Sequence, residues 1–246
     1  MPRKAFVLYH STFHRTAKRI AELLDVPAHN TNTLARPPRG STLILNWGCK
    51  NPTMEFVRIN GTWLNPPGAI RLTADKYLLM QQMSINGISV PDHYNHPEPN
   101  TVIRDRFSWG GRDLLNKIQI NHPFWVKWIE KTREFRIYFA REPDGTIRLA
   151  LREKEGDKSK SVWNRHNGFT FKNIPEDQAT LRSELFAFGK RCIPTTNLTF
   201  GTVDIIKDHD GTTYLLEVNT APRLQDGLYP GTMIAETLSK WITNAE

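Results

Sequence analysis

The stretch that most constrains the fold is residues 198–222, LTFGTVDIIKDHDGTTYLLEVNTAP, in which two apolar, β-rich runs flank Asp-His-Asp-Gly at 208–211. Two such runs on either side of an Asp-Gly pair predict a β-hairpin. If residues 210 and 211 form a two-residue turn, the register places Asp204 opposite Glu217. A longer loop over 208–211 would instead place Glu217 diagonal to Asp204.

Side chains alternate between the two faces of a hairpin. Asp204, Glu217 and Asn219 then share one face, which we expect to border a solvent-filled cleft. The apolar residues project to the core face: Val203, Ile205, Leu216 and Val218. Two facing carboxylates repel each other, and with an amide oxygen they form a ligand set suited to Mg²⁺, completed by water and phosphate oxygens. A solvated hairpin face is the alternative interpretation.

Composition and net charge limit the classes of protein to which this chain can belong. At 246 residues the chain can form one large domain or two to three small lobes. No apolar run approaches the roughly 18 residues of a membrane span, and the N-terminus lacks signal-peptide features. Cys49 and Cys192 have no metal-ligand spacing, so we expect reduced thiols and a cytoplasmic location. The net charge of +8 and a pI near 9.6 favour anionic partners such as nucleotide phosphates, an acidic peptide or nucleic acid.

The first hundred residues suggest a small α/β lobe. Apolar runs at 6–9 and 43–45 predict buried strands, with an amphipathic helix between them and a proline-containing loop at 27–41. We expect Thr73 to cap a helix that ends at Gly87. Residues 91–100, rich in proline and polar side chains, predict a linker.

For the residues after position 100, the sequence predicts strands joined by charged loops. Residues 101–104, 134–140 and 147–151 predict strands, and Asp144-Gly145 predicts a hairpin turn between the last two. Paired glycines at 110 and 111 indicate either a phosphate-covering loop or an ordinary turn. The basic segment 152–168 is either an electropositive lip or a solvated loop. Two helices, at 180–189 and 232–242, complete the predicted elements.

In this order the segments resemble the ATP-grasp superfamily of carboxylate–amine ligases, over nearly the whole chain and most strongly at residues 200–222. The chain is similar to the ligase that adds glutamate to a ribosomal protein and, more distantly, to D-alanine–D-alanine ligase. The resemblance implies a mixed α/β and α+β fold. An N-terminal α/β pre-ATP-grasp lobe with a linking helix would span residues 1–98. Two α+β subdomains, residues 99–129 and 130–246, would hold ATP between them.

The resemblance also implies roles for individual residues. Asp204, Glu217 and Asn219 match the ligands of one or two Mg²⁺ ions, for which Mn²⁺ can substitute. The positions that match ATP-binding residues are Lys76, Arg104, Ser108, Gly110, Gly111, Val126, Lys127, Trp128, Ile129, Glu134 and Lys154. Arg152 and Arg165 resemble catalytic basic residues near the γ-phosphate and acyl group. Arg136, Asn167 and Arg223 are assigned to the substrate. Arg104 stands where the family usually has lysine, so the phosphate geometry there differs.

The implied activity is Mg²⁺-dependent, ADP-forming ligation of a carboxylate to an amine through an acylphosphate. The implied partners are ATP, a carboxylate donor and an amine acceptor, with an anionic or macromolecular acceptor left open, an oligomer allowed and no membrane. One alternative is a phosphotransferase on the same scaffold. Another is a basic nucleic-acid-binding protein without ligase activity. Seven tryptophans and the positive charge support it, although they are scattered along the chain.

Overall fold

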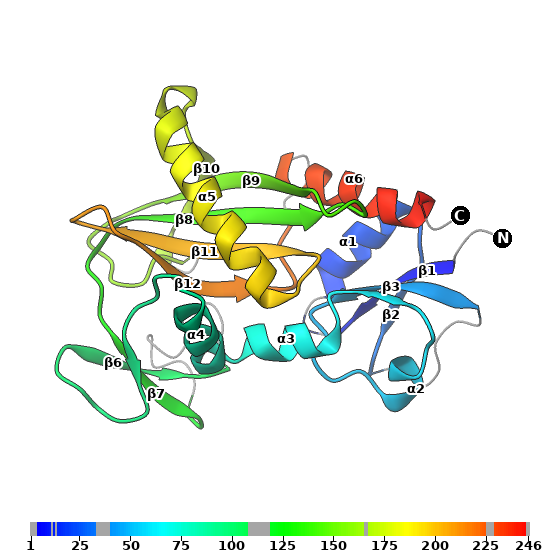
Figure 1. Cartoon of the computed structure of the whole chain (residues 1–246), viewed down its shortest axis with the longest axis horizontal. Coiled ribbons are helices and arrows are strands. Elements are labelled where there is room, and N and C mark those ends of the chain that lie inside the picture. The colour runs from blue at the N-terminus through cyan, green and yellow to red at the C-terminus, as the bar shows by residue number, and fades with distance from the viewer. Residues whose placement is uncertain are drawn as a thin grey trace.

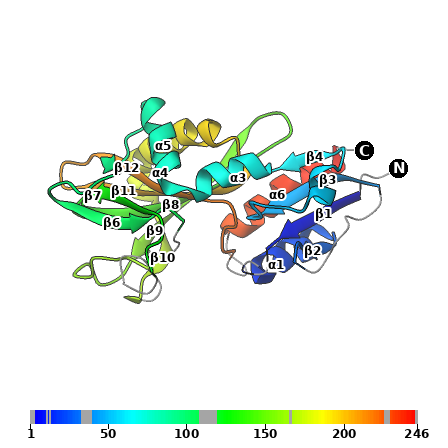
Figure 2. The ribbon, with the colours of Figure 1, turned by 90° about the horizontal axis from the view of Figure 1, so that it is seen from below.

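The computed structural model describes residues 4–10, 12, 14–32, 40–107, 119–164, 167–224 and 229–244, which form three sheets with helices packed against them (Figure 1). The molecule is elongated, with both chain ends at one end and strands β6 to β12 at the other (Figure 2). Within the described part of the chain, every helix is too short or too polar to cross a bilayer. The mixed α/β and α+β fold class predicted from the sequence is confirmed.

The N-terminal sheet is parallel, in the order β2–β1–β3–β4. Its strands are β1 (Lys4–Tyr9), β2 (Ala28–Asn30), β3 (Ser41–Trp47) and β4 (Thr62–Leu64). Helices α1 (His14–Leu24) and α6 (Tyr229–Thr243) share one hydrophobic core with it, in which Val7, Leu45 and Ile234 are fully buried. Phe56 of α2 (Met54–Val57) packs under the other face. The predicted strand–helix–strand is confirmed, but β2 lies inside the predicted loop 27–41 because three residues are too few to show a periodic pattern.

Two helices connect this sheet to the rest, where the sequence predicted one helix capped by Thr73. They are α3 (Pro67–Ala74) and α4 (Lys76–Ile85), separated by Asp75, whose backbone is extended. The Asp75 carboxylate accepts the backbone N–H of Leu78 at 3.1 Å and is the N-cap of α4. The Thr73 hydroxyl instead donates to the carbonyl of Ala69 at 3.0 Å within α3. The predicted cap is therefore wrong, because the carboxylate two residues later caps the second helix.

The second sheet is antiparallel, in the order β5–β7–β6. Its strands are β5 (His93–Tyr94), β6 (Thr101–Asp105) and β7 (Pro123–Lys127). Phe124 and Val126 of β7 pack against Met80 of α4. Strand β5 lies in the predicted linker and shares a sheet with β6, on the other side of the predicted boundary at residue 98. The three domain ranges remain predictions.

The third sheet is antiparallel, in the order β10–β9–β8–β11–β12. Its strands are β8 (Lys131–Arg141), β9 (Ile147–Glu155), β10 (Thr170–Asn173), β11 (Phe200–Asp208) and β12 (Thr213–Asn219). One face is apolar and packs against α3, α4 and α5 (Ala179–Thr196), with Phe135, Ile137 and Val203 fully buried. Helix α5 continues past its predicted end at Gly189. A Cβ at that glycine would lie 2.8 Å from the Ile137 side chain, so the residue allows close helix–sheet packing.

The β11–β12 hairpin is confirmed, but its turn is longer than two residues. The N–H of Asp208 donates to the carbonyl of Thr212 at 3.1 Å, and Gly211 has φ +80°. A bulge then offsets this longer loop, because Ile205 pairs with Leu215 whereas Asp204 pairs with Glu217. The predicted opposition of the two carboxylates is therefore confirmed. The prediction that Leu216 enters the core is wrong, because the bulge places Leu215 there, fully buried.

Candidate functional site

The face of the third sheet opposite α5 carries the three predicted metal ligands and four other predicted site residues. Alternation along the strands and the pairing between them place polar side chains from four strands on this face. They are Glu134, Arg136 and Tyr138 of β8, Arg152 and Lys154 of β9, Thr202 and Asp204 of β11, and Glu217 and Asn219 of β12. Predicted metal, cofactor and substrate residues are thus brought together on one surface.

Asp204 and Arg136 form a buried ion pair at its centre. Both carboxylate oxygens of Asp204 accept from the Arg136 guanidinium at 2.6 Å, and the exposed side-chain fractions are 3% and 16%. Burial alone would raise the pKa of Asp204, but the adjacent guanidinium holds it below its usual value. The expected exposure of Asp204 to a solvent-filled cleft is therefore wrong. Glu217 is half-buried and accepts a hydrogen bond from the Asn219 amide at 3.0 Å.

Glu134 links two lysines at the edge of the same surface. It is 3% exposed and accepts from Lys131 at 2.6 Å and, through its other oxygen, from Lys154. The Lys131 ammonium also lies 4.7 Å from the centre of the Trp163 ring. Burial lowers the pKa of Lys131, and the charges of Lys154 and Arg104 lower it further. Arg104 of β6 therefore lies near this edge of the third sheet.

Lys76 is buried at the start of α4, and its backbone N–H donates to the carbonyl of Arg106 at 2.9 Å. Arg106 in turn pairs with the Asp75 carboxylate. These contacts hold the N-terminus of α4 against the end of β6, close along the chain to Arg104.

The predicted hinge, Val126 to Ile129, covers the end of β7 and the residues before β8. Val126 is buried in the core, whereas Trp128 is 38% exposed. The backbone N–H groups of Lys127 and Trp128 donate to Asp92 and Asn100 at 2.8 and 2.9 Å. These two donors therefore serve the protein's own fold, so adenine recognition by this backbone remains a prediction.

Asn167 forms a hydrogen bond within the loop that follows β9. Its amide donates to the carbonyl of Val162 at 2.7 Å and stabilises the loop that carries Trp163. Ser108, Gly110, Gly111 and Arg165 lie outside the described residues.

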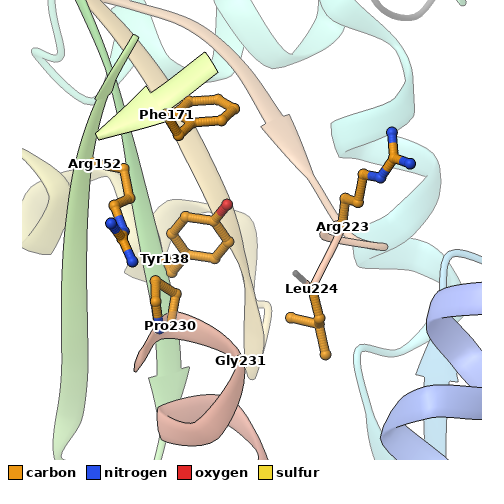
Figure 3. A pocket seen from close by; sticks show the side chains of 7 residues that line it. All are labelled: Tyr138, Arg152, Phe171, Arg223, Leu224, Pro230 and Gly231. Atoms are coloured by element: carbon orange, nitrogen blue, oxygen red, sulfur yellow. The ribbon is translucent and has the colours of Figure 1, made fainter. Parts of the chain in front are cut away.

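A small, open pocket lies beside Arg152 (Figure 3). Its lining comes from three strands, the segment after β12 and the first turn of α6: Tyr138, Arg152, Phe171, Arg223, Leu224, Pro230 and Gly231. In Figure 3 the Tyr138 ring stands between Arg152 on one side and Arg223 on the other. Burial raises the pKa of the Tyr138 hydroxyl. Arg152, predicted to be catalytic, and Arg223, predicted to bind the substrate, therefore line one pocket, and both roles remain predictions.

Four residues of this surface were not predicted from the sequence: Lys131, Tyr138, Phe171 and Thr202. Alternation with Glu134 and Arg136 could have identified Tyr138. Alternation along β11 from Asp204 could have identified Thr202, which is fully buried and whose hydroxyl has no hydrogen-bond partner within the described part of the chain. No sequence pattern identified Phe171 as a site residue, because a four-residue strand is too short to predict that β10 pairs with β9.

The donor chemistry fits a hard cation only in part. In the described ranges, there is no cluster of three or more His, Cys, Asp or Glu side chains arranged to hold a metal ion. The available protein donors are two carboxylates and one amide, which are the oxygen ligands that Mg²⁺ prefers when phosphates and water complete its shell.

No protein-family model and no curated protein sequence matches this chain. Solved structures do match. D-alanyl-alanine synthetase A from Vibrio cholerae has a TM-score of 0.71 and 11% identity, over 100% of this chain and 99% of that one. The ATP-grasp ligase PsnB, complexed with a minimal precursor, has a TM-score of 0.66 and 11% identity, over 98% and 100%.

A third match is carboxyaminoimidazole ribonucleotide synthase from Aspergillus clavatus, complexed with ATP. Its TM-score is 0.64 at 11% identity, over 92% of this chain and 72% of that one. At such identities the likeness establishes architecture rather than activity. The chain has the ATP-grasp fold, as its sequence resemblance predicted.

Proposed function

We propose that this chain is an ATP-dependent, ADP-forming carboxylate–amine ligase. The observation that carries the proposal is the pair of facing carboxylates, Asp204 and Glu217, on a sheet surface that also presents Arg136, Arg152 and Lys154. Cationic side chains next to a carboxylate pair suit a bound metal–nucleotide complex, in which phosphate charge must be neutralised. The ATP bound by the Aspergillus clavatus enzyme of the same fold is consistent with this reading.

Asp204, Glu217 and Asn219 would hold Mg²⁺. Glu217 and Asn219 can offer oxygens directly, whereas Asp204 becomes a ligand only if Arg136 leaves at least one of its oxygens. When bound, Mg²⁺ supplies charge neutralisation and orientation of the phosphoryl oxygens.

The remaining residues would position the reactants. Lys76, Arg104 and Lys154 would contact the phosphates, and the displaced Arg136 guanidinium would remain close enough to do so as well. A substrate carboxylate would attack the γ-phosphorus, releasing ADP and leaving an acylphosphate. An amine would then attack the acyl carbon and expel phosphate, giving an amide. In-line positioning and charge stabilisation account for such catalysis, so no side-chain nucleophile is required.

The test is ADP release measured over a panel of carboxylic acids with and without amines, with mass spectrometry of the product. Glu217→Gln should lower turnover at least about a hundredfold, since even outer-shell changes at metal sites cost 10–100-fold. Glu155→Gln is the matched control, because this carboxylate on β9 is exposed and pairs with Lys172 away from the site. ADP release by Glu217→Gln at the wild-type rate would contradict the proposal. ADP release that never depends on an amine would favour the phosphotransferase instead.

A further inference from the structure

Two carboxylates that face each other across a hairpin repel, and a neighbouring strand offsets this repulsion. Arg136 of β8, Asp204 of β11 and Glu217 of β12 lie in one row across the three strands. Both carboxylate oxygens of Asp204 accept hydrogen bonds from the Arg136 guanidinium at 2.6 Å. The guanidinium therefore provides a positive charge beside the facing carboxylates.

Glu217 takes part in the same interaction. Burial alone would lower the pKa of the Arg136 guanidinium, but the charge of Asp204 and, more weakly, that of Glu217 raise it above its usual value. The guanidinium thus interacts with both carboxylates that we assign to Mg²⁺. Because it holds both oxygens of Asp204, it must turn away before Asp204 can become a metal ligand.

Turning away is unfavourable when only a free divalent cation is present. The side chains of Asp204 and Arg136 are 3% and 16% exposed, so the guanidinium would lose its counter-charge in a site largely closed to water. A nucleotide changes this balance, because its phosphate oxygens can accept forked hydrogen bonds from a guanidinium. The ring of Phe171, whose centre lies 4.8 Å from the guanidinium carbon, gives the side chain a further contact on this surface.

We propose that Arg136 is a resident counter-ion that keeps the metal site closed until a metal–nucleotide complex binds. Arg136 then turns to the phosphates of the complex, and Asp204 becomes a ligand. The inference rests on the proposed function and deepens it, because it names how that site is regulated: metal binding depends on the nucleotide. Removal of the guanidinium should therefore open the site to the metal ion alone.

The probe is Mn²⁺ alone, in nucleotide-free protein, with binding measured from the loss of the electron paramagnetic resonance signal of the free ion. Arg136→Met should bind Mn²⁺ at least about tenfold more tightly than the wild type, because the two facing carboxylates are left without a cation. Arg136→Gln keeps an N–H donor and removes the charge, so it should also bind more tightly, and it replaces Arg136→Met if that variant does not fold. Adding Glu217→Gln to either variant should abolish the gain, as expected for an ion at the hairpin.

Arg133→Met is the matched control. Arg133 lies on the same strand but on its other face, where its guanidinium donates two 2.7 Å hydrogen bonds to Glu153. The substitution removes the same charge and a similar forked ion pair. It should change the affinity for Mn²⁺ less than about twofold, because the pair is not part of the metal site.

Thermal denaturation separates a metal-site role of Arg136 from a purely structural one. Mn²⁺ should raise the melting temperature of Arg136→Met by more than that of the wild type or of Arg133→Met, because the ion replaces the missing counter-charge. An Arg136→Met variant that Mn²⁺ neither binds more tightly nor stabilises would assign Arg136 a structural role and overturn the inference. An equal gain in Arg133→Met, or a gain that survives Glu217→Gln, would overturn it as well.

These measurements contain no nucleotide, so their failure is distinguishable from failure of the proposed function. Amine-dependent ADP release by the wild type, with unchanged Mn²⁺ affinity in the Arg136 variants, would refute only the resident counter-ion. Tighter Mn²⁺ binding by the variants, with no ATP turnover by the wild type, would refute only the ligase.

Discussion

Replacing Asp204 by asparagine should destabilise the protein, contrary to what an exposed metal ligand would do. The carboxylate is 3% exposed and forms two 2.6 Å hydrogen bonds with Arg136. Asparagine leaves the guanidinium buried without its counter-charge. Breaking a buried pair in this way costs about 3–5 kcal/mol. Glu217 is close enough to interact with Arg136, so we expect the lower end of that range. At roughly 2–4 °C per kcal/mol, the melting temperature should fall by at least roughly 6 °C.

The assay is urea and thermal denaturation of the wild type, Asp204→Asn, Arg136→Met and the double variant. The double variant should be less destabilised than the sum of the single variants, with a coupling energy of at least about 1 kcal/mol. Glu217→Gln, at a half-buried position, is the comparator and should lose less than about 1 kcal/mol. The reasoning is refuted if Asp204→Asn lies within about 1 kcal/mol of the wild type, or if the two substitutions are additive.

The same structure gives three further predictions. Leu215→Ala should lower the free energy of unfolding by about 2–5 kcal/mol and Leu216→Ala by about 1 kcal/mol or less, as measured by urea denaturation, because the bulge buries only Leu215 completely. Equal losses of stability in the two variants would contradict this register. The stability difference between wild type and Asp204→Asn should persist from neutral pH down to about pH 4 and shrink at lower pH in pH-dependent denaturation. The pKa of Asp204 is lower in the folded state than in the unfolded state, so its carboxylate stabilises the fold fully above the unfolded-state pKa. This stabilisation is lost as the pH falls through the folded-state pKa. If the stability difference between the wild type and Asp204→Asn were already lost at pH 6, this assignment would be refuted. Neither cysteine should react with a thiol reagent in native protein at pH 8, because burial raises the pKa of the Cys49 thiol and, to about 12, the pKa of the Cys192 thiol. Modification faster than unfolding would show an accessible thiol.

Much of the architecture could be predicted because its signals are local. Strands β1 and β3 contain continuous apolar runs, and β8 alternates Glu134, Arg136 and Tyr138 with the apolar residues Phe135, Ile137 and Phe139. The facing of Asp204 and Glu217 was also predicted, although for an incomplete reason. The turn is longer than predicted, and the bulge compensates for the extra length, so Asp204 and Glu217 still face each other. The same bulge places Leu215 in the core, where Leu216 was predicted.

The remainder depends on contacts distant in sequence. No sequence pattern around Asp204 indicates that Arg136, 68 residues away, donates hydrogen bonds to both of its carboxylate oxygens. That Arg152 forms no ion pair with a described residue becomes evident only once Asp204 and Glu134 are seen to pair with Arg136 and with two lysines. The pocket beside it joins β10 to the start of α6, and no periodicity links those segments.

The most direct test of the proposed site is a crystal structure with Mg²⁺ and a non-hydrolysable ATP analogue. We predict an ion about 2.1 Å from oxygens of Glu217 and Asn219, bridging phosphate oxygens, with Arg136 turned away from at least one oxygen of Asp204. A nucleotide bound elsewhere, or bound with the Asp204–Arg136 pair intact and no ion at Glu217, would contradict the proposed role of the β11–β12 hairpin.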